Sequence, residues 1–194
     1  NRMVQRHEVL RTRFVAEDGV PLQVVAEHLE LALPVEDVSG LPEAARAQAV
    51  ASALALQWRT PFDLERGPLL RVRLLKLGDT EHVLIRCCHH IVSDGWSAGV
   101  MNREIAALYE AFARGESDPL GPLPVQYGDY ALWQEAWLSS GALADGLAYW
   151  KRQLAGIPER LSLVTDRPRP ALQSFAAGRV AGWLDPKVTS DLKG

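Results

Sequence analysis

The sequence predicts a mixed fold of the α/β (α+β) class, in which strands and helices follow one another along the chain. Two pairs of β-rich runs are each joined by a short turn sequence, Asp18-Gly19 in the first pair and residues 78–81 in the second. Segments with helical spacing of apolar residues lie between and after these pairs. No internal repeat is present, so a layered fold suits the sequence better than a repeat architecture.

The first elements are a short helix and a hairpin. Residues 1–9 are typical of the last turns of a helix, and residues 10–16 follow as a strand. Asp18-Gly19 closes that strand, because this pair readily adopts the positive φ angles of a tight hairpin turn. Residues 21–27 are then the return strand.

An alanine-rich helix and a second hairpin come next. The helix is predicted over residues 42–58, opened by Ser39 or Pro42 and stopped before Pro61. Residues 69–77 and 82–90 are apolar, β-rich runs that form the second hairpin. A motif with two histidines lies at the exit of this hairpin.

Helices predominate in the rest of the chain. Residues 97–113 carry one apolar stripe, formed by Met101, Ile105, Leu108 and Phe112. Gly115 ends that helix, and residues 119–124 form a Pro/Gly-rich linker. Two further helices are predicted over 127–138 and 143–154, followed by an extended crossing over 158–170. Aromatic anchors of these two helices are Tyr130, Trp133, Trp137, Tyr149 and Trp150.

Composition and charge exclude several function classes. The 194-residue chain is 47% hydrophobic and 23% charged, as in an ordinary globular protein. Its formal net charge of −3 offers no basic surface for a nucleic-acid backbone. Cys87 and Cys88 are neighbours whose side chains point to opposite faces of a strand, which excludes a disulfide framework. With no signal peptide and no apolar span of about 18 residues, we expect a cytoplasmic protein without a membrane segment.

The motif His89-His90-Ile91-Val92-Ser93-Asp94-Gly95 ends a strand, makes a turn and opens a helix, a place where folds present side chains to a cleft. Because neighbouring strand side chains point to opposite faces, we expect only one of the two histidines to enter a shared cavity. An imidazole there can accept a proton from an attacking amine or hydroxyl, which suits acyl transfer. Asp94 is expected to fix the turn by an ion pair, and Gly95 permits close approach of a substrate.

Two other interpretations of the histidine pair stay open. One is a purely structural role, which is ordinary for histidines at the end of a strand. The other is a metal site, although His7, His28 and His82 show no ligand spacing with the pair and no cysteine cluster supports it.

Residues 89–95, a His-His-x-x-x-Asp-Gly motif followed by Trp96-Ser97, resemble the active-site motif of nonribosomal peptide synthetase condensation domains. These domains have the chloramphenicol-acetyltransferase-like fold. Residues 6–14, Arg-His-Glu-Val-Leu-Arg-Thr-Arg-Phe, resemble the family's second motif, and residues 127–134, Tyr-Gly-Asp-Tyr-Ala-Leu-Trp-Gln, its fourth. Weaker similarities occur at 61–64, 67–71, 149–150 and 166–170, so the resemblance covers nearly the whole chain.

The resemblance implies an α/β (α+β) sandwich that forms one lobe of a two-lobed domain. The family's first motif is expected upstream of Asn1 and its fifth beyond Gly194, so we expect a chain truncated at both ends. The predicted division is an amino-terminal lobe over 1–170, and the crossover and beginning of the carboxy-terminal lobe over 171–194. We expect the isolated fragment to be weakly active or inactive, because half of the active-site tunnel would be missing.

The resemblance further implies peptide-bond formation. An upstream acyl or peptidyl thioester and the amine of a downstream aminoacyl thioester would meet at His90, which acts as a general base or orients the amine. The substrates would ride on phosphopantetheine arms of upstream and downstream peptidyl carrier proteins, with no cofactor bound directly. An adenylation domain of the same assembly line is a further expected partner.

Supporting roles follow from the same resemblance. His89 is expected to be structural, and Asp94 is expected to pair with Arg6 or Arg11, which the sequence does not separate. Gly95 would place its backbone N–H close to the substrate carbonyl.

Rival functions are a non-catalytic module that docks carrier proteins and a stand-alone, ester-forming acyltransferase. Epimerisation is disfavoured by the residues after Asp-Gly, and heterocycle formation by the histidines that stand where cyclisation domains carry aspartates. The Arg-His-Glu and Asp-Gly-Trp-Ser details favour joining of an L-donor to an L-acceptor.

Overall fold

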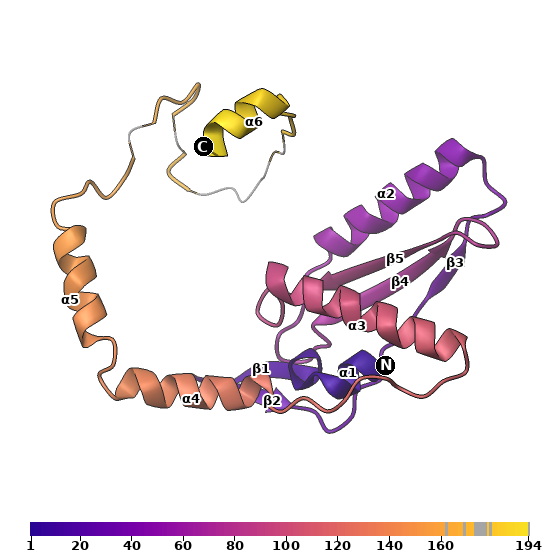
Figure 1. The fold of residues 1–194 in the computed structure, drawn as a ribbon, viewed down its shortest axis with the longest axis horizontal. Coiled ribbons are helices and arrows are strands. Elements are labelled where there is room, and N and C mark those ends of the chain that lie inside the picture. The colour runs from indigo at the N-terminus through magenta and orange to yellow at the C-terminus, as the bar shows by residue number, and fades with distance from the viewer. Residues whose placement is uncertain (162, 169, 173–177, 179, 194) are drawn as a thin grey trace. The chain divides into compact units, whose positions relative to one another are not determined.

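The computed structural model describes residues 1–161, 163–168, 170–172, 178 and 180–193 of the chain. The chain forms two compact units, Asn1–Asp145 and Gly146–Gly194. Strands and helices are mixed in the first unit, which confirms the predicted fold class (Figure 1). The predicted lobe boundary at residue 170 stays a prediction.

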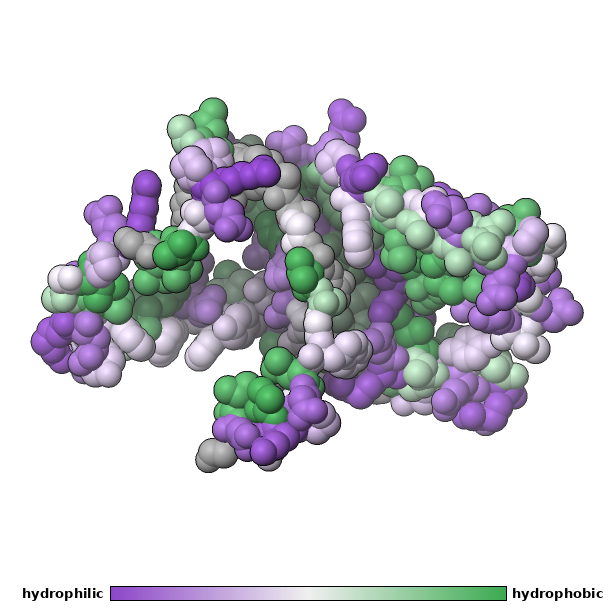
Figure 2. Space-filling model, turned by 90° about the horizontal axis from the view of Figure 1, so that it is seen from above, coloured by the Kyte–Doolittle hydropathy of each residue, from purple (hydrophilic) through white to green (hydrophobic). Residues whose placement is uncertain are grey.

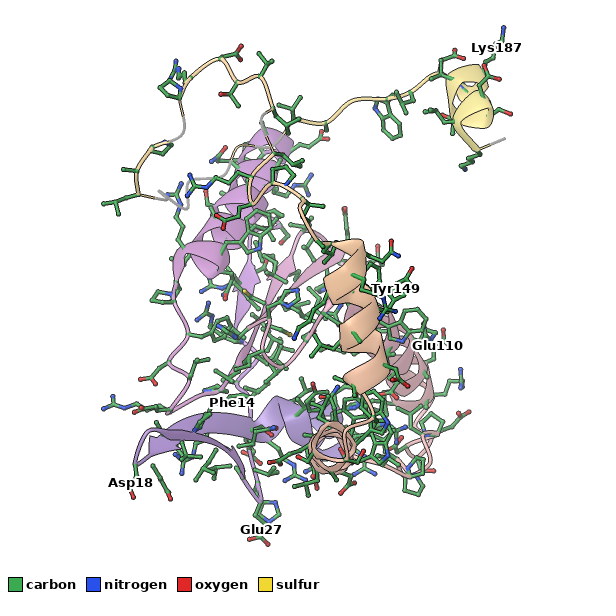
Figure 3. The ribbon with its side chains drawn as sticks, turned by 90° about the vertical axis from the view of Figure 1, so that its left-hand side faces the viewer. Phe14, Asp18, Glu27, Glu110, Tyr149 and Lys187 are labelled. Atoms are coloured by element: carbon green, nitrogen blue, oxygen red, sulfur yellow. The ribbon has the colours of Figure 1, made fainter. Side chains whose placement is uncertain are left out.

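The amino-terminal elements lead into a hairpin, as predicted. Helix α1 (Arg2–Arg6) and the 3-10 helix η1 (Glu8–Arg11) precede β1 (Thr12–Glu17), which pairs antiparallel with β2 (Val20–Val25). Asp18 and Gly19 have φ angles of 51° and 81°, the positive values that a two-residue hairpin turn requires. Asp18 lies at the tip of this hairpin in Figure 3, and Phe14 lies on β1.

A second, three-stranded sheet has the order β3-β4-β5. Strands β4 (Leu70–Lys76) and β5 (His82–Cys88) form the predicted second hairpin. The sequence pattern does not predict β3 (Val35–Asp37), which pairs parallel with β4. All three residues of β3 are exposed, so this strand carries no alternation of apolar and polar residues that would reveal it.

Two helices cover opposite faces of this sheet. Leu75 and Ile85 pack with Ala53 of α2 (Glu43–Arg59), whereas Leu70 packs with Met101 of α3 (Gly95–Ala113). Leu70 and Leu75 are an odd number of positions apart on β4, so their side chains point to opposite faces. The first unit is therefore layered as helix, sheet, helix (Figure 1).

The apolar stripe of α3 is confirmed at three of its four predicted positions. Met101 and Leu108 are buried, and Ile105 packs against the same cluster. Phe112 is 49% exposed, and Ala111 is buried instead, so the prediction for Phe112 is wrong. Ala111 lies three residues after Leu108 and shares its helix face, and this smaller residue meets the core at the last turn.

The remaining helices carry mostly exposed residues. Helix α4 (Tyr127–Ser139) belongs to the first unit, α5 (Ala144–Gln153) begins at its end, and α6 (Pro186–Lys193) lies in the second unit. The predicted aromatic anchors of α4 and α5 are exposed rather than buried, and on α4 Trp133 stacks on Trp137 and meets Tyr130 at a tilt. Figure 2 shows hydrophobic residues reaching the surface among hydrophilic ones.

The segment over residues 158–170 contains no helix or strand among its described residues, as predicted. Within the part of the chain that the structure describes, every helix is too short or too polar to cross a bilayer.

Candidate active site

The histidine motif joins β5 to α3. β5 ends at Cys88, and the backbone N–H of His89 still donates to the carbonyl of Leu69, at 2.9 Å. The N–H of Val92 then donates to the carbonyl of His89, at 3.1 Å, which closes the turn. Helix α3 begins at Gly95, so the motif makes the turn and opens the helix as the sequence predicts, but the predicted strand ends two residues before His90, at Cys88.

The two histidine rings have different surroundings. The His89 ring is half-buried, accepts a hydrogen bond at Nδ1 from the N–H of Ile91 (3.1 Å) and meets the Phe62 ring edge-on, with 5.9 Å between ring centroids. The His90 ring is exposed. A structural role for His89 and an accessible imidazole at His90 are both compatible with this arrangement.

Both histidines line one open pocket of about 440 Å³, which we call the His90 pocket. The expectation that only one of them enters a shared cavity is therefore wrong. Cys87 and Cys88 are neighbours inside β5 and also line this pocket, so the pocket reaches both faces of the strand at this end and the alternation of side chains does not separate the two histidines. The other residues of the wall come from β5, the end of α2 and the segment after α2. They are Cys87, Cys88, Gln57, Trp58, Thr60, Pro61 and Phe62.

Asp94 is the N-cap of α3. Its Oδ1 accepts hydrogen bonds from the backbone N–H of Ser97 (2.7 Å) and from the Ser97 hydroxyl (2.6 Å). These hydrogen bonds hold the pKa of the Asp94 carboxyl below its ordinary value, with a smaller electrostatic contribution from His90. The carboxylate thus stabilises the start of the helix that follows the turn.

The predicted ion pair of Asp94 with an arginine is wrong for both candidates. Arg6 donates through Nε to Glu104 Oε1 at 3.1 Å, and Arg11 contacts Glu8 at 3.2 Å. An N-cap carboxylate is already satisfied by the free N–H groups of its own helix, so it needs no cation behind the turn.

The second motif packs against α3 through Glu104. Besides Arg6, this carboxylate contacts His7, with 2.6 Å between Nε2 and Oε2. Burial raises the pKa of Glu104, but the hydrogen bonds from His7 and Arg6 outweigh it and leave the pKa below its ordinary value. Sequence reasoning missed Glu104, although an acidic residue between Met101 and Leu108 on an apolar helix face signals a cationic partner.

Gly95 and the cysteines add little to the site's geometry. A Cβ at Gly95 would meet no atom within 4 Å, so packing does not require glycine there, and its role toward a substrate stays a prediction. Cys87 Sγ lies 3.6 Å from the carbonyl of Gln57, and burial raises the pKa of the Cys88 thiol. Among the described residues, no three His, Cys, Asp or Glu side chains converge as metal ligands.

The cap geometry predicts opposite outcomes for two substitutions at residue 94. Asp94→Asn is expected to leave the melting temperature of the domain nearly unchanged, because Asn caps helices as well as Asp does, whereas Asp94→Ala lowers it.

The cap also makes stability depend on pH. Above its unfolded pKa of 3.8, the wild-type carboxylate contributes fully to the free energy of unfolding. It loses this contribution as the pH falls through the lowered folded pKa, and the Asn variant is expected to show no such loss. Thermal unfolding followed by circular dichroism measures both effects. Equal destabilisation by Asn and Ala at neutral pH would favour an ion pair over a cap.

Solved structures place this fold among chloramphenicol-acetyltransferase-like domains. The X-domain from teicoplanin biosynthesis, solved in complex with OxyB, is 31% identical with a TM-score of 0.78, and the match covers 91% of this chain and 38% of that chain. SgcC5 from Streptomyces globisporus is 30% identical with a TM-score of 0.68, over 80% of this chain and 35% of that chain. The starter condensation domain of rhizomide synthetase RzmA shares the fold, with a TM-score of 0.72.

The sequence comparison agrees with the fold. The family model of the condensation domain matches residues 1–194. The chain therefore belongs to the condensation-domain family, which confirms the resemblance drawn from its motifs. A linear gramicidin synthase of Brevibacillus parabrevis is 46% identical over 89% of the chain, and malpibaldin synthetase of Mortierella alpina is 45% identical over 97%. The chain spans about 3% of the length of each of these relatives.

Proposed function

We propose that the domain containing this chain forms peptide bonds in nonribosomal peptide biosynthesis. It joins an upstream acyl or peptidyl thioester to the amine of a downstream aminoacyl thioester. The observation that carries the proposal is the exposed His90 ring at the wall of an open pocket, in a chain of the condensation-domain family. An accessible imidazole suits a reaction in which an amine loses a proton as it attacks a carbonyl.

In this reaction the amine attacks the thioester carbonyl, the carbon–nitrogen bond forms, the carbon–sulfur bond breaks, and the proton that the amine loses ends on the departing thiolate of the donor arm. His90 accepts a hydrogen bond from the attacking amine, which holds the nitrogen in line with the carbonyl carbon. Gly95, the first residue of α3, offers its N–H to the developing oxyanion. His89 and Asp94 keep the turn and the helix start in place through their bonds to Ile91 and Ser97.

The partners of the proposed reaction are carrier proteins. Upstream and downstream peptidyl carriers present the substrates on phosphopantetheine arms, and an adenylation domain of the same assembly line selects the amino acid. Similarity to several peptide synthetases supports this context, for example 41% identity to phosphinothricin tripeptide synthetase PhsC of Streptomyces viridochromogenes. We place the assembly line in the cytoplasm.

A docking role is the second candidate. The X-domain that resembles this chain was solved in complex with another protein, OxyB, which favours a condensation-type fold as a binding surface. A third activity, ester formation, is suggested by SgcC5, which was solved with a naphthyl ethanediol. These candidates differ in whether a covalent product forms and in which nucleophile is joined.

One assay separates the three functions. The complete domain is supplied with an acyl-loaded donor carrier and with acceptor carriers bearing either an amino acid or its hydroxy-acid analogue, and the carrier-bound products are identified by mass spectrometry. We expect the amide to form, faster with an L-donor than with a D-donor. Preferential ester formation would replace the proposal by an ester-forming acyltransferase. Carrier binding without any covalent product would support the docking role.

A further inference from the structure

We propose that Arg71 is a positioning residue for the active-site turn, acting through Phe62 and His89 on the backbone that carries His90. The proposal rests on the proposed function, which makes His90 the group that meets the amine. It assigns a role to the segments 61–64 and 67–71, which the reaction described above does not use.

Arg71 ties the end of α2 to the sheet. Its guanidinium donates from Nε to the side-chain oxygen of Gln57 (3.1 Å) and from Nη2 to the carbonyls of Gln57 (2.9 Å) and Thr60 (2.6 Å). Nη1 donates to the carbonyl of Pro61 at 3.0 Å. Carbonyls at a helix end lack intrahelical donors, so one arginine side chain fixes the direction in which the chain leaves α2.

The same guanidinium holds the next aromatic ring. The Arg71 Cζ atom lies 3.7 Å from the centroid of the Phe62 ring, a cation–π contact. Phe62 follows Pro61 directly, so its backbone is held by the bonds just described. Its ring then meets the His89 ring edge-on at 89°, with both rings on the wall of the His90 pocket. Phe62 thereby limits the orientations open to the His89 imidazole.

His89 transmits this constraint to the turn. Its Nδ1 accepts the N–H of Ile91, and its own backbone N–H is bonded to Leu69. The hydrogen bonds of His89 therefore fix the backbone on both sides of His90, at His89 itself and at Ile91. Strand register brings Arg71 close to this point, because Arg71 pairs with Cys87, two residues before His89. The contacts form one continuous series, from the Arg71 guanidinium through the Phe62 ring and the His89 imidazole to the backbone amide of Ile91.

Lysine cannot replace arginine in this series. An ammonium group is a compact charge with three donors, whereas the planar guanidinium bonds to several carbonyls in its plane and stacks on a ring with its face. A loosened turn shifts His90 relative to the reacting atoms, and misplacements of about 1 Å cost up to about 100-fold in rate. Arg71→Lys is therefore expected to lower kcat, while the KM for the loaded acceptor carrier stays unchanged because the carrier surface is untouched.

The test uses the complete domain with loaded carriers and three variants. Arg71→Lys and Phe62→Leu are each expected to lower kcat by roughly 10- to 100-fold, whereas Phe62→Tyr keeps the ring contacts and restores most of the rate. The double variant Arg71→Lys/Phe62→Leu should lose no more than the worse single variant, because both act through one series of contacts. Arg73→Lys is the matched control, since Arg73 lies on the same face of β4 but pairs with Glu36, at 3.0 Å.

A spectroscopic measurement accompanies the kinetics. With ¹⁵N-labelled histidine, the ring signals of His89 should shift in Arg71→Lys and Phe62→Leu, and stay in place in Arg73→Lys. Normal kcat in folded Arg71→Lys, or a lower melting temperature with normal kcat, would overturn the proposal. If the wild-type domain forms no amide, the proposed function is wrong, but the positioning role can still be tested by the spectra. In that case, His89 signals that do not shift in Arg71→Lys and Phe62→Leu would overturn the positioning role.

Discussion

Replacing His90 by Ala in the complete domain is expected to lower the rate of amide formation by about 100-fold or more while leaving the fold intact. The ring is exposed at the wall of the His90 pocket, so its removal leaves no buried cavity, and it takes away the group that we propose meets the amine. Rates are measured by mass spectrometry of the carrier-bound product, and folding by circular dichroism. His82→Ala is the matched control, because His82 is an exposed histidine at the other end of β5.

A second substitution at the same position separates the two roles of the imidazole. Gln can accept a hydrogen bond from the amine but cannot take up its proton, so His90→Gln should recover part of the rate if His90 orients the amine. If His90 is a general base, His90→Gln is as slow as His90→Ala, because the amide side chain cannot take up the proton. Full turnover by a well-folded His90→Ala protein would refute any role for His90 in the reaction.

Truncating the core beneath the site is expected to have the largest effect on stability. Leu75→Ala should lower the free energy of unfolding by about 2–5 kcal/mol, because Leu75 is 0% exposed and packs between the sheet and α2. Gln57 and Trp58 of α2 line the His90 pocket, so their positions depend on this contact. Urea denaturation of the purified domain measures the loss.

Leu84→Ala is the matched control for this experiment. Leu84 pairs with Leu74 on the neighbouring strand but is 42% exposed, so its truncation removes little buried area and leaves no enclosed cavity. Similar losses for Leu75→Ala and Leu84→Ala would contradict the packing of α2 on the sheet.

Local signals predicted most of the secondary structure. Asp18-Gly19 predicts its hairpin because two adjacent residues meet the φ requirement of the turn by themselves. The alanine-rich helix and the stripe of α3 follow from spacing along one chain segment. β3 was missed because its pairing with β4 is parallel and joins segments far apart in the sequence. The prediction for Phe112 is wrong because the last turn of α3 meets the core with Ala111.

The motifs also identified the family and the place of the candidate site. Consecutive residues predict that His89-His90 lies at the end of a β-hairpin and that Asp94-Gly95 lies at the start of a helix. Both positions are confirmed. The sequence does not predict that both histidines line one pocket, because the pocket forms only where the end of α2 and the segment after it meet the end of β5.

The sequence by itself determined the two hairpins, most of the helices, the membership of the condensation-domain family and the histidine motif after the second hairpin, because each rests on residues that are neighbours in the chain. Only the tertiary structure decided the partners of the charged side chains. Arg6 bonds to Glu104, and Arg71 to the end of α2 and Phe62. Hydrogen bonds and ion pairs require atoms to come within about 3 Å, and for segments far apart in the sequence that approach is set by the packing of sheet and helices.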